Sequence, residues 1–150
     1  MSSMQALAAT PVSELPPRPH AHVDITDPLW KVVAEMTSKG RGAVLVEEAG
    51  ALVGIFTERD LISRVDHGDQ LWSHVVVRDV MTPHPMVVRP ADSLAEALRR
   101  LIAGHRRHLP VVDERGKVLG LLSIRDILVH VAGQFPEEMV NLPPGPDHES

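Results

Sequence analysis

The sequence predicts an α/β fold built from two tandem β-α-β-β-α repeats. A seven-residue phrase occurs twice, as GIFTERD from Gly54 to Asp60 and as GLLSIRD from Gly120 to Asp126, an offset of 66 residues. Before each phrase, a helical apolar pattern is followed by two short apolar runs of the kind that form strands. Because two copies are too few for an open solenoid, we expect two halves that pack face to face.

The first repeat is expected over residues 22–75. Asp27 is the predicted N-cap of its first helix, with a proline in the first turn, and Gly40 is the predicted end of that helix. The runs AVLV, from Ala43, and ALVGIF, from Ala51, predict two strands joined by the turn EEAG. DLISRV, at the end of the first phrase, begins a second helix.

The second repeat is expected over residues 76–135 and follows the same order. MVV, from Met86, predicts a short strand. Ser93 and Glu96 have the spacing of a capping box, at the start of a helix that stops at Gly104. The runs LPVV and KVLGLL predict the next two strands, and IRDILVHV predicts the final helix.

The two repeats align with one change of register. Residues 42–60 match residues 108–126 at an offset of 66, with six of nineteen positions identical. Upstream, Asp27 matches Asp92 at an offset of 65. We expect the one-residue difference to fall in the turn before the first strand of the strand pair, since such turns tolerate insertions.

The two ends of the chain have compositions that disfavour packing. Residues 1–21 are rich in Ala, Ser and Pro, and their run ELPPRP cannot form a helix. Residues 136–150 contain a similar proline-rich stretch. We therefore expect a disordered N-terminal arm over residues 1–21 and a Pro-rich C-terminal tail over residues 136–150.

The composition excludes several classes of protein. The chain of 150 residues has no cysteine, which excludes disulfides, thiolate catalysis and zinc–sulfur sites. Aromatic residues make up 3% and the net charge is −5 without a basic stripe, so we expect no nucleic-acid partner. No secretion signal is visible and no apolar run approaches the ~20 residues of a membrane span, so we expect a cytoplasmic protein without a membrane partner.

The repeated phrase has a structural interpretation and a functional one. Thr57 with Asp60, and Ser123 with Asp126, have the spacing of a capping box, which stabilises a helix by about 1 kcal/mol. A strand that leads into a helix also presents free N–H groups that suit phosphate, and a carboxylate there can accept from both hydroxyls of a ribose. The same residues can therefore cap a helix and hold a nucleotide.

Two further features of the phrase favour a ligand. Gly54 and Gly120 fall inside predicted strands, where glycine often marks the close approach of a ligand or of another backbone. Arg59 and Arg125 each add a guanidinium fork of the kind that recognises phosphate.

The two phrases resemble the ligand motif of cystathionine β-synthase (CBS) domains. The segments VRDVMTPHPMVVRPADSLAEAL and HRRHLPVVDERGKVLG are also similar to that family, and the resemblance covers about Val23 to Val131. It implies two CBS repeats packed as a pseudo-two-fold Bateman module whose clefts bind AMP, ADP, ATP or S-adenosylmethionine. It further implies a homodimer and an effector protein. The first repeat departs from the pattern, because HAHVDITDPL lacks the Met-Thr-Pro phrase.

The resemblance assigns roles to individual positions. It implies that the two motif aspartates accept from ribose hydroxyls, that the hydroxyl residues contact sugar or phosphate, and that the arginines contact phosphate. These residues are Asp60, Thr57 and Arg59 in the first repeat and Asp126, Ser123 and Arg125 in the second. The adenine is expected to lie against Thr26, Gly42 and Ala43 in the first repeat and against Ala91, His108, Leu109 and Pro110 in the second.

Other classes of function fit the sequence less well. A metal site needs three or four converging ligands, and neither His105 with His108 nor His20 with His22 has a visible third, so we expect no metal and no cofactor. No serine has the companions of a hydrolase nucleophile, so we expect no enzyme activity. The alternative to a ligand sensor is a nucleotide-free interaction scaffold in which the phrases only cap helices.

Overall fold

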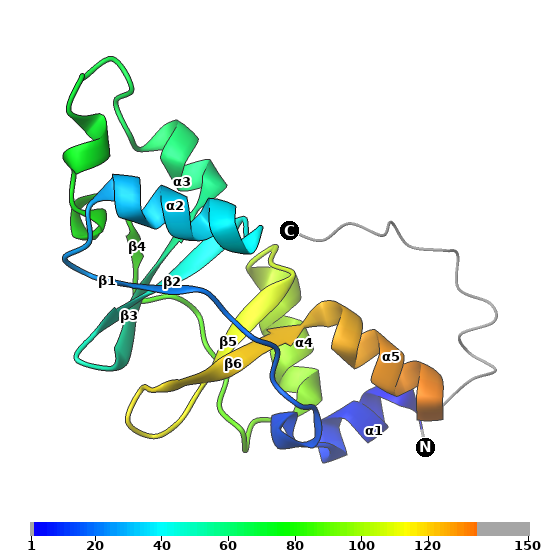
Figure 1. The fold of residues 1–150 in the computed structure, drawn as a ribbon. Helices are drawn as coiled ribbons and strands as arrows, with labels where there is room; N and C mark the ends of the chain where they lie inside the picture. Colours follow the sequence, from blue (N-terminus) through cyan, green and yellow to red (C-terminus); the bar gives the residue numbers. More distant parts are fainter. Residues whose placement is uncertain (1, 135–150) are drawn as a thin grey trace. The chain divides into compact units, whose positions relative to one another are not determined.

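The computed structural model describes residues 2–134, whose elements are labelled in Figure 1. The helices are α1 (Ser3–Ala9), α2 (Leu29–Lys39), α3 (Glu58–Ser63), α4 (Leu94–Ala103) and α5 (Ile124–Gln134), with 3-10 turns at Val12–Glu14, Trp72–His74 and Val77–Asp79. The strands are β1 (His22–Asp24), β2 (Ala43–Glu48), β3 (Ala51–Thr57), β4 (Thr82–Pro83), β5 (His108–Val112) and β6 (Val118–Ser123). The mixed α/β fold with two tandem repeats is confirmed.

The described residues fall into two compact units. One, called the first-repeat unit below, holds residues 19–85 and 115–118. The other, called the second-repeat unit, holds residues 2–18, 86–114 and 119–134. The Pro-rich tail predicted over residues 136–150 lies outside the described residues. Among the helices of residues 2–134, none is both long enough and apolar enough to cross a bilayer.

The first-repeat unit is built on a four-stranded sheet in the order β1-β2-β3-β4. β1 runs parallel to β2, and the other neighbours are antiparallel. Val44, Val46 and Phe56 on this sheet are at most 1% exposed and share one apolar core with Leu29 and Val32 of α2. The helical spacing of the α2 residues and the alternation along β2 therefore bury matching faces.

Of the two ends predicted for α2, only the C-terminal end agrees with the structure. The helix stops at Gly40, whose φ of 59° is the left-handed conformation that glycine adopts easily. The predicted N-cap is wrong by one residue, because Pro28 holds that position. The Asp27 carboxylate instead accepts from the backbone N–H of Asp24 at 2.9 Å, which closes the turn between β1 and the helix.

The second-repeat unit has a smaller sheet. β5 and β6 pair with each other, and Val88 adds a single parallel bridge to Val111. The strand predicted from Met86 is thus reduced to one bridging residue, since Pro85 and Pro90 have no N–H with which to extend the ladder.

Helix α4 carries half of the capping box that its sequence predicts. The Ser93 side chain accepts from the Glu96 N–H at 3.0 Å. The Glu96 carboxylate does not complete the box, because it accepts from Arg99 and Arg100. Hydrogen bonds from Arg99 are the largest cause that lowers the pKa of Glu96 to about 2, and the hydrogen bond from Arg100 and the charges of both arginines add to it against the opposing effect of desolvation.

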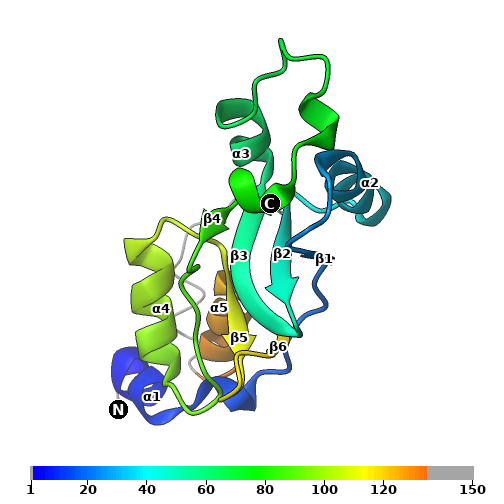
Figure 2. The same cartoon turned by 90° about the vertical axis from the view of Figure 1, so that its left-hand side faces the viewer.

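The N-terminal arm, expected to be disordered, packs on the second-repeat unit instead. Ser2 and Gln5 form a reciprocal capping box at the start of α1. Leu7 and Val12 are 3% and 2% exposed and belong to the core of this unit. Figure 2 shows α1 beside α4, with which it is in contact. The proline-rich composition concealed these two apolar anchors, whose burial offsets the entropy of ordering the arm.

The segment that precedes each repeat packs in the unit of the other repeat. Pro11 bridges Ser93 in the second-repeat unit, and Val76 bridges Pro28 in the first-repeat unit. Both bridges are antiparallel. They join equivalent residues of the two repeats, since Val76 stands 65 positions after Pro11 and Ser93 stands 65 positions after Pro28. Contacts therefore divide the chain near residues 18 and 85 rather than at the predicted boundaries near residues 21 and 75.

The packing of each preceding segment in the unit of the other repeat also explains why the first repeat lacks the Met-Thr-Pro phrase. β4, which contains Thr82 and Pro83, pairs with β3 through Gly54. In the second-repeat unit, Arg18 forms the corresponding antiparallel bridge to Leu121. The counterpart of the phrase is therefore the run Pro-Arg-Pro from Pro17 to Pro19, and not a part of HAHVDITDPL.

The structure also moves the register change between the repeats. Val23 pairs with Val46 as Val88 pairs with Val111, so these strands correspond at an offset of 65. The change to 66 falls within the hairpin that follows, where the β2–β3 pairing shifts register after Val46. The prediction that it precedes the strands is wrong, because Val46 and Gly54 are 8 positions apart whereas Val111 and Gly120 are 9 apart, so the second hairpin holds the extra residue.

The two phrase glycines are explained by close protein neighbours. A Cβ atom on Gly54 would overlap the Sδ of Met81. A Cβ atom on Gly120, whose φ is 153°, would lie 2.5 Å from the Cβ of Pro17 and 2.7 Å from the carbonyl oxygen of Arg18. The missing side chain of each glycine leaves room for the segment that precedes a repeat. The close approach of a ligand is therefore not needed to explain either glycine.

We expect Gly120→Ala to destabilise the protein by about 1–3 kcal/mol, because the new methyl group would push the backbone of residues 17–18 off the sheet and because a φ of 153° strains alanine. Gly133→Ala is the control for the added methyl group, since no atom lies within 4 Å of a Cβ built at that position of α5, and it should match or exceed the stability of the wild type. Urea unfolding at pH 7 measures both. A Gly120→Ala variant as stable as the wild type would show that the arm does not need this close approach.

Candidate functional site

Each predicted set of site residues centres on a corner where a strand leads into a helix. The first-repeat corner joins β3 to α3 and holds Thr57 and Asp60. The second-repeat corner joins β6 to α5 and holds Ser123 and Asp126. Both corners can be described in full within their own units.

At the first-repeat corner, the capping box is complete. Asp60 Oδ2 accepts from the Thr57 N–H at 3.0 Å, and Thr57 Oγ1 accepts from the Asp60 N–H at 3.1 Å. The other carboxylate oxygen lies 3.3 Å from Arg64 Nε, one helical turn later. Asp60 is 7% exposed, so its carboxylate is both buried and engaged locally.

At the second-repeat corner, the carboxylate is engaged by a residue 108 positions away. Arg18 donates from Nε to Asp126 Oδ2 at 2.8 Å and from Nη2 to Oδ1 at 2.7 Å. The Ser123 hydroxyl accepts from the Arg125 N–H at 3.0 Å. A guanidinium fork therefore occupies both oxygens that a ribose would need.

The electrostatics of Asp126 follow from this fork. The hydrogen bonds from Arg18 are the largest cause that lowers the pKa of Asp126, against the opposing effect of burial. The charge of Arg18, a backbone hydrogen bond from Ser123 and the proximity of His108 lower this pKa further. The carboxylate is therefore ionised at neutral pH and ready to accept hydrogen bonds.

One residue accounts for the difference between the corners. Four positions after Asp60 stands Arg64, whereas four positions after Asp126 stands His130. The Nε2 of His130 is buried and has no hydrogen-bond partner among residues 2–134. Without an arginine one turn later in its helix, Asp126 takes its cation from the arm.

The start of the middle strand completes each corner. Ala43 pairs with Thr57 across the sheet, and the Gly42 carbonyl accepts from the Glu58 N–H at 3.0 Å. At the other corner, the Arg107 carbonyl accepts from the Ile124 N–H at 2.9 Å. Gly42 and Ala43 lie at the first-repeat corner, and their structural counterparts at the second-repeat corner are Arg107 and the predicted residue His108.

Four of the predicted adenine-contacting residues do not line these corners. Thr26 lies beyond the far end of β1, where its N–H and hydroxyl both donate to Asp24. Ala91 follows Val88 toward the opposite end of β5 from His108, because Val88 pairs in parallel with Val111. Leu109 is 0% exposed in the apolar core, and Pro110 is buried beside it. These positions were assigned by the family resemblance.

The two motif arginines, Arg59 and Arg125, are exposed on the first turns of α3 and α5.

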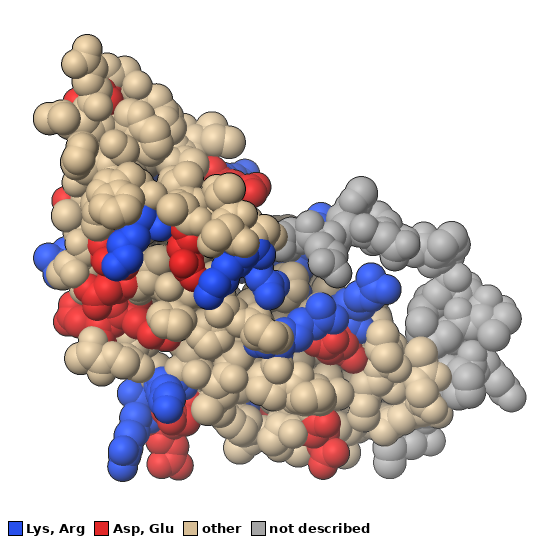
Figure 3. Space-filling view, in the orientation of Figure 1, with Lys and Arg blue, Asp and Glu red and all other residues tan. Residues whose placement is uncertain are grey.

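Acidic and basic side chains are mixed over the face drawn in Figure 3. That mixture agrees with the absence of a basic stripe in the sequence.

Sequence reasoning missed two residues at the second-repeat corner. Arg18 lies in a segment expected to be disordered, and its signal was the Ser-x-x-Gln capping box at Ser2, which marks the arm as structured. Arg107 was hidden by the register change in the hairpin.

The structure also brings Glu47 to the pair His20 and His22, so that three groups capable of holding a metal lie together.

Comparisons with known proteins agree with this architecture. The sequence profile of the CBS domain matches residues 12–67 and 77–133. A signal-transduction protein with CBS domains from Burkholderia ambifaria has a solved structure that is 31% identical, with a TM-score of 0.64 over 88% of this chain and 94% of that one. The crystal structure of CBSX2 in complex with AMP is 29% identical, with a TM-score of 0.69 over 85% of this chain and 98% of that one.

Curated relatives are longer. The meiotically up-regulated gene 70 protein of Schizosaccharomyces pombe is 39% identical over 104 residues, which are 69% of this chain and 14% of that protein. An uncharacterised protein of Methanopyrus kandleri is 32% identical over 76% of this chain, which spans 60% of it. With the profile matched twice and the fold shared, the chain belongs to the CBS domain family and carries two tandem CBS repeats.

Proposed function

We propose that the protein is a non-catalytic regulatory module that binds an adenosine-containing ligand, AMP, ADP, ATP or S-adenosylmethionine, at the second-repeat corner. The observation that carries the proposal is the ionised carboxylate of Asp126 in the first turn of α5, held by a cation that the ligand can replace. A relative of the same fold was crystallised with AMP, which supports this class of ligand.

The second-repeat corner is the better candidate of the two. The side chain of Asp126 is 23% exposed, against 10% for Asp60. Asp60 is also tied to Thr57 and Arg64 within its own helix and cap, and those bonds stabilise α3. Arg18, by contrast, is 37% exposed along its side chain and comes from outside the helix, so it can turn away without unfolding α5.

In this proposal the ligand competes with Arg18. Ribose hydroxyls donate to Asp126 in place of the guanidinium, and the released Arg18 stays near the corner because residue 18 still pairs with Leu121 through two backbone hydrogen bonds. The positive charge of Arg18, together with Arg125 and the N-terminal end of α5, then favours a phosphate on the ligand. The changed position of the Arg18 side chain is the signal that a homodimer partner or an effector reads.

The engaged carboxylates also support a second candidate, a nucleotide-free scaffold. Both motif aspartates already have protein partners, as expected if the corners serve stability alone. The two candidates differ in whether any adenosine compound stabilises the protein.

We expect AMP, ADP, ATP or S-adenosylmethionine at 100 times its dissociation constant to add about 2.7 kcal/mol of stability. For a chain of this size that corresponds to a rise in Tm of about 5–10 °C. Differential scanning fluorimetry with the four compounds measures it, with guanosine monophosphate as the control. A flat response to all four would favour the scaffold.

We expect Arg18→Ala to tighten the binding of adenosine about three- to tenfold, because the ribose then meets an uncontested carboxylate. Adenosine is the probe because it has no phosphate for Arg18 to contact. In the Arg18→Ala background, the further change Asp126→Ala should weaken adenosine binding about 10- to 150-fold. That factor corresponds to the loss of about 1.5–3 kcal/mol of charge-assisted hydrogen bonding. Calorimetry that finds weaker binding in Arg18→Ala, or no change on adding Asp126→Ala, would refute the competition.

We expect the stability contributed by Arg18 to depend on pH. The pKa of folded Asp126 lies below its ordinary value of 3.8, so the ion pair stabilises the protein above that pH and ceases to do so as the pH falls through the lowered pKa. Both side chains are partly exposed, so Arg18→Ala should cost about 1 kcal/mol at pH 7.

Urea unfolding of the wild type and of Arg18→Ala between pH 7 and pH 2.5 measures this dependence. The difference in unfolding free energy between the two proteins should shrink below pH 3.8. Arg59→Ala, which changes an exposed arginine at the other corner, is the control and should show no such trend. A pH-independent cost would assign the effect of Arg18 to packing.

A further inference from the structure

We propose that His20, His22 and Glu47 form a binding site for a zinc-class divalent cation on the first-repeat unit. Two imidazoles and one carboxylate are a ligand set that zinc takes in proteins, with a fourth position left to water. The nitrogen and oxygen atoms that these residues offer all lie within 4.8 Å of one another. This proposal is independent of the adenosine site.

The backbone places the three side chains on one face of the sheet. His20 and His22 are two residues apart in extended chain, so both point the same way, while Ala21 and Val23 between and after them are 3% and 5% exposed in the core. β1 pairs in parallel with β2, opposing Asp24 to Glu47. The Glu47 side chain therefore projects from the neighbouring strand on the same side as the two histidines.

The distances suit closure around an ion. The His20 and His22 rings are 5.7 Å apart between centroids and tilted by 46°. His20 Nε2 lies 4.0 Å from Glu47 Oε1, which is too long for a hydrogen bond. With metal bonds of about 2.0–2.1 Å, tetrahedral ligand atoms lie about 3.3 Å apart, so side-chain shifts on the order of 1 Å complete the site.

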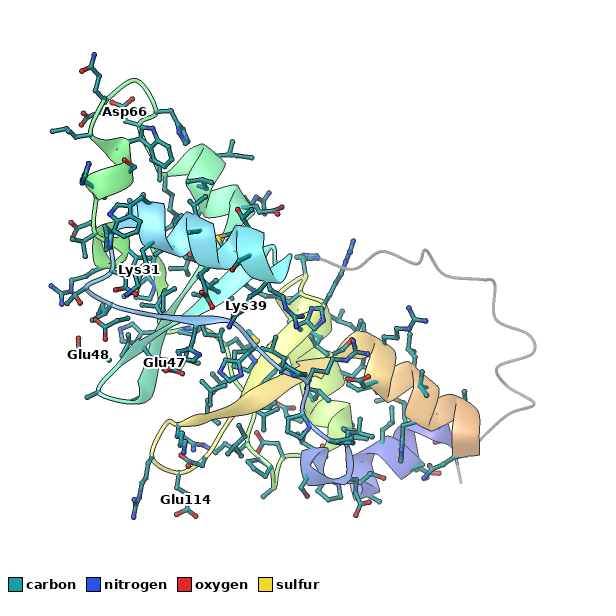
Figure 4. The ribbon with its side chains drawn as sticks, viewed as in Figure 1. Lys31, Lys39, Glu47, Glu48, Asp66 and Glu114 are labelled. Atoms are coloured by element: carbon teal, nitrogen blue, oxygen red, sulfur yellow. The ribbon has the colours of Figure 1, made fainter. Side chains whose placement is uncertain are left out.

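One basic side chain lies near the three proposed ligands. Lys39, labelled with Glu47 in Figure 4, is an unfavourable neighbour for a cation, but its ammonium pairs with Glu35 at 2.9 Å.

A cation bound here would fasten β1 to β2. β1 has only three residues and pairs with a single neighbour in the sheet, so three metal bonds would add substantially to its attachment. The sequence conceals this site, because Glu47 follows His22 by 25 positions and reaches it only through strand pairing.

The experiment uses the full-length protein after chelator treatment and dialysis, titrated with ZnCl2 by calorimetry at pH 7.5. We expect one zinc per chain and a rise in Tm on binding. His22→Ala and Glu47→Gln should each weaken zinc binding at least about tenfold, since the loss of even an outer-shell partner costs about 10- to 100-fold. MgCl2 should bind far more weakly, because magnesium prefers oxygen ligands.

Glu48→Gln is the matched control. Glu48 is the next residue of β2, lies beside Glu47 in Figure 4 and alternates to the other side of the strand, so its loss should leave the affinity unchanged. The far-ultraviolet circular dichroism of each variant verifies folding. The absence of zinc binding, or binding that His22→Ala and Glu47→Gln leave unaltered, would overturn the proposal.

Discussion

The carboxylate in the first turn of a repeat's last helix is the group around which both corners are organised. It sits where a strand gives way to a helix, so backbone N–H groups converge on it and it needs a counter-charge when partly buried. Asp60 receives that charge from Arg64 in its own helix. Asp126 has a histidine at the corresponding position and receives it from Arg18. One substitution in an otherwise repeated motif thus links the N-terminal arm to the second corner.

The packing of the two segments that precede the repeats makes that link possible. Each repeat is preceded by a segment that pairs with the strands of the other repeat's unit, and the phrase glycines make room for it. In the first-repeat unit the segment presents Met81, Thr82 and Pro83, which carry no charge. In the second-repeat unit it presents Arg18. The two corners therefore share a backbone plan but differ in electrostatics, because the cation that pairs with the motif aspartate comes from the same helix at one corner and from the arm at the other.

Much of the fold follows from local sequence. The strands β2, β3, β5 and β6 and the helices α2 to α5 lie where apolar periodicity places them, because burial of one face rewards that periodicity directly. The phrase residues also lie at the corners as predicted, since a capping box is a local structure. Where local signals were weak, prediction failed. The arm appeared disordered although Leu7 and Val12 anchor it, and four of the positions that the resemblance assigned to adenine lie away from the corners.

The sequence by itself determined the repeat, the corners and the residues that cap them, because each of these depends on contacts within a few positions along the chain. Tertiary structure alone decided which distant groups meet. It brought Arg18 to Asp126, Pro17 to Gly120, and Glu47 to His20 and His22. These meetings depend on strand pairing between segments that lie far apart in sequence, and pairing partners are selected by the free energy of the whole packed unit and not by any local preference.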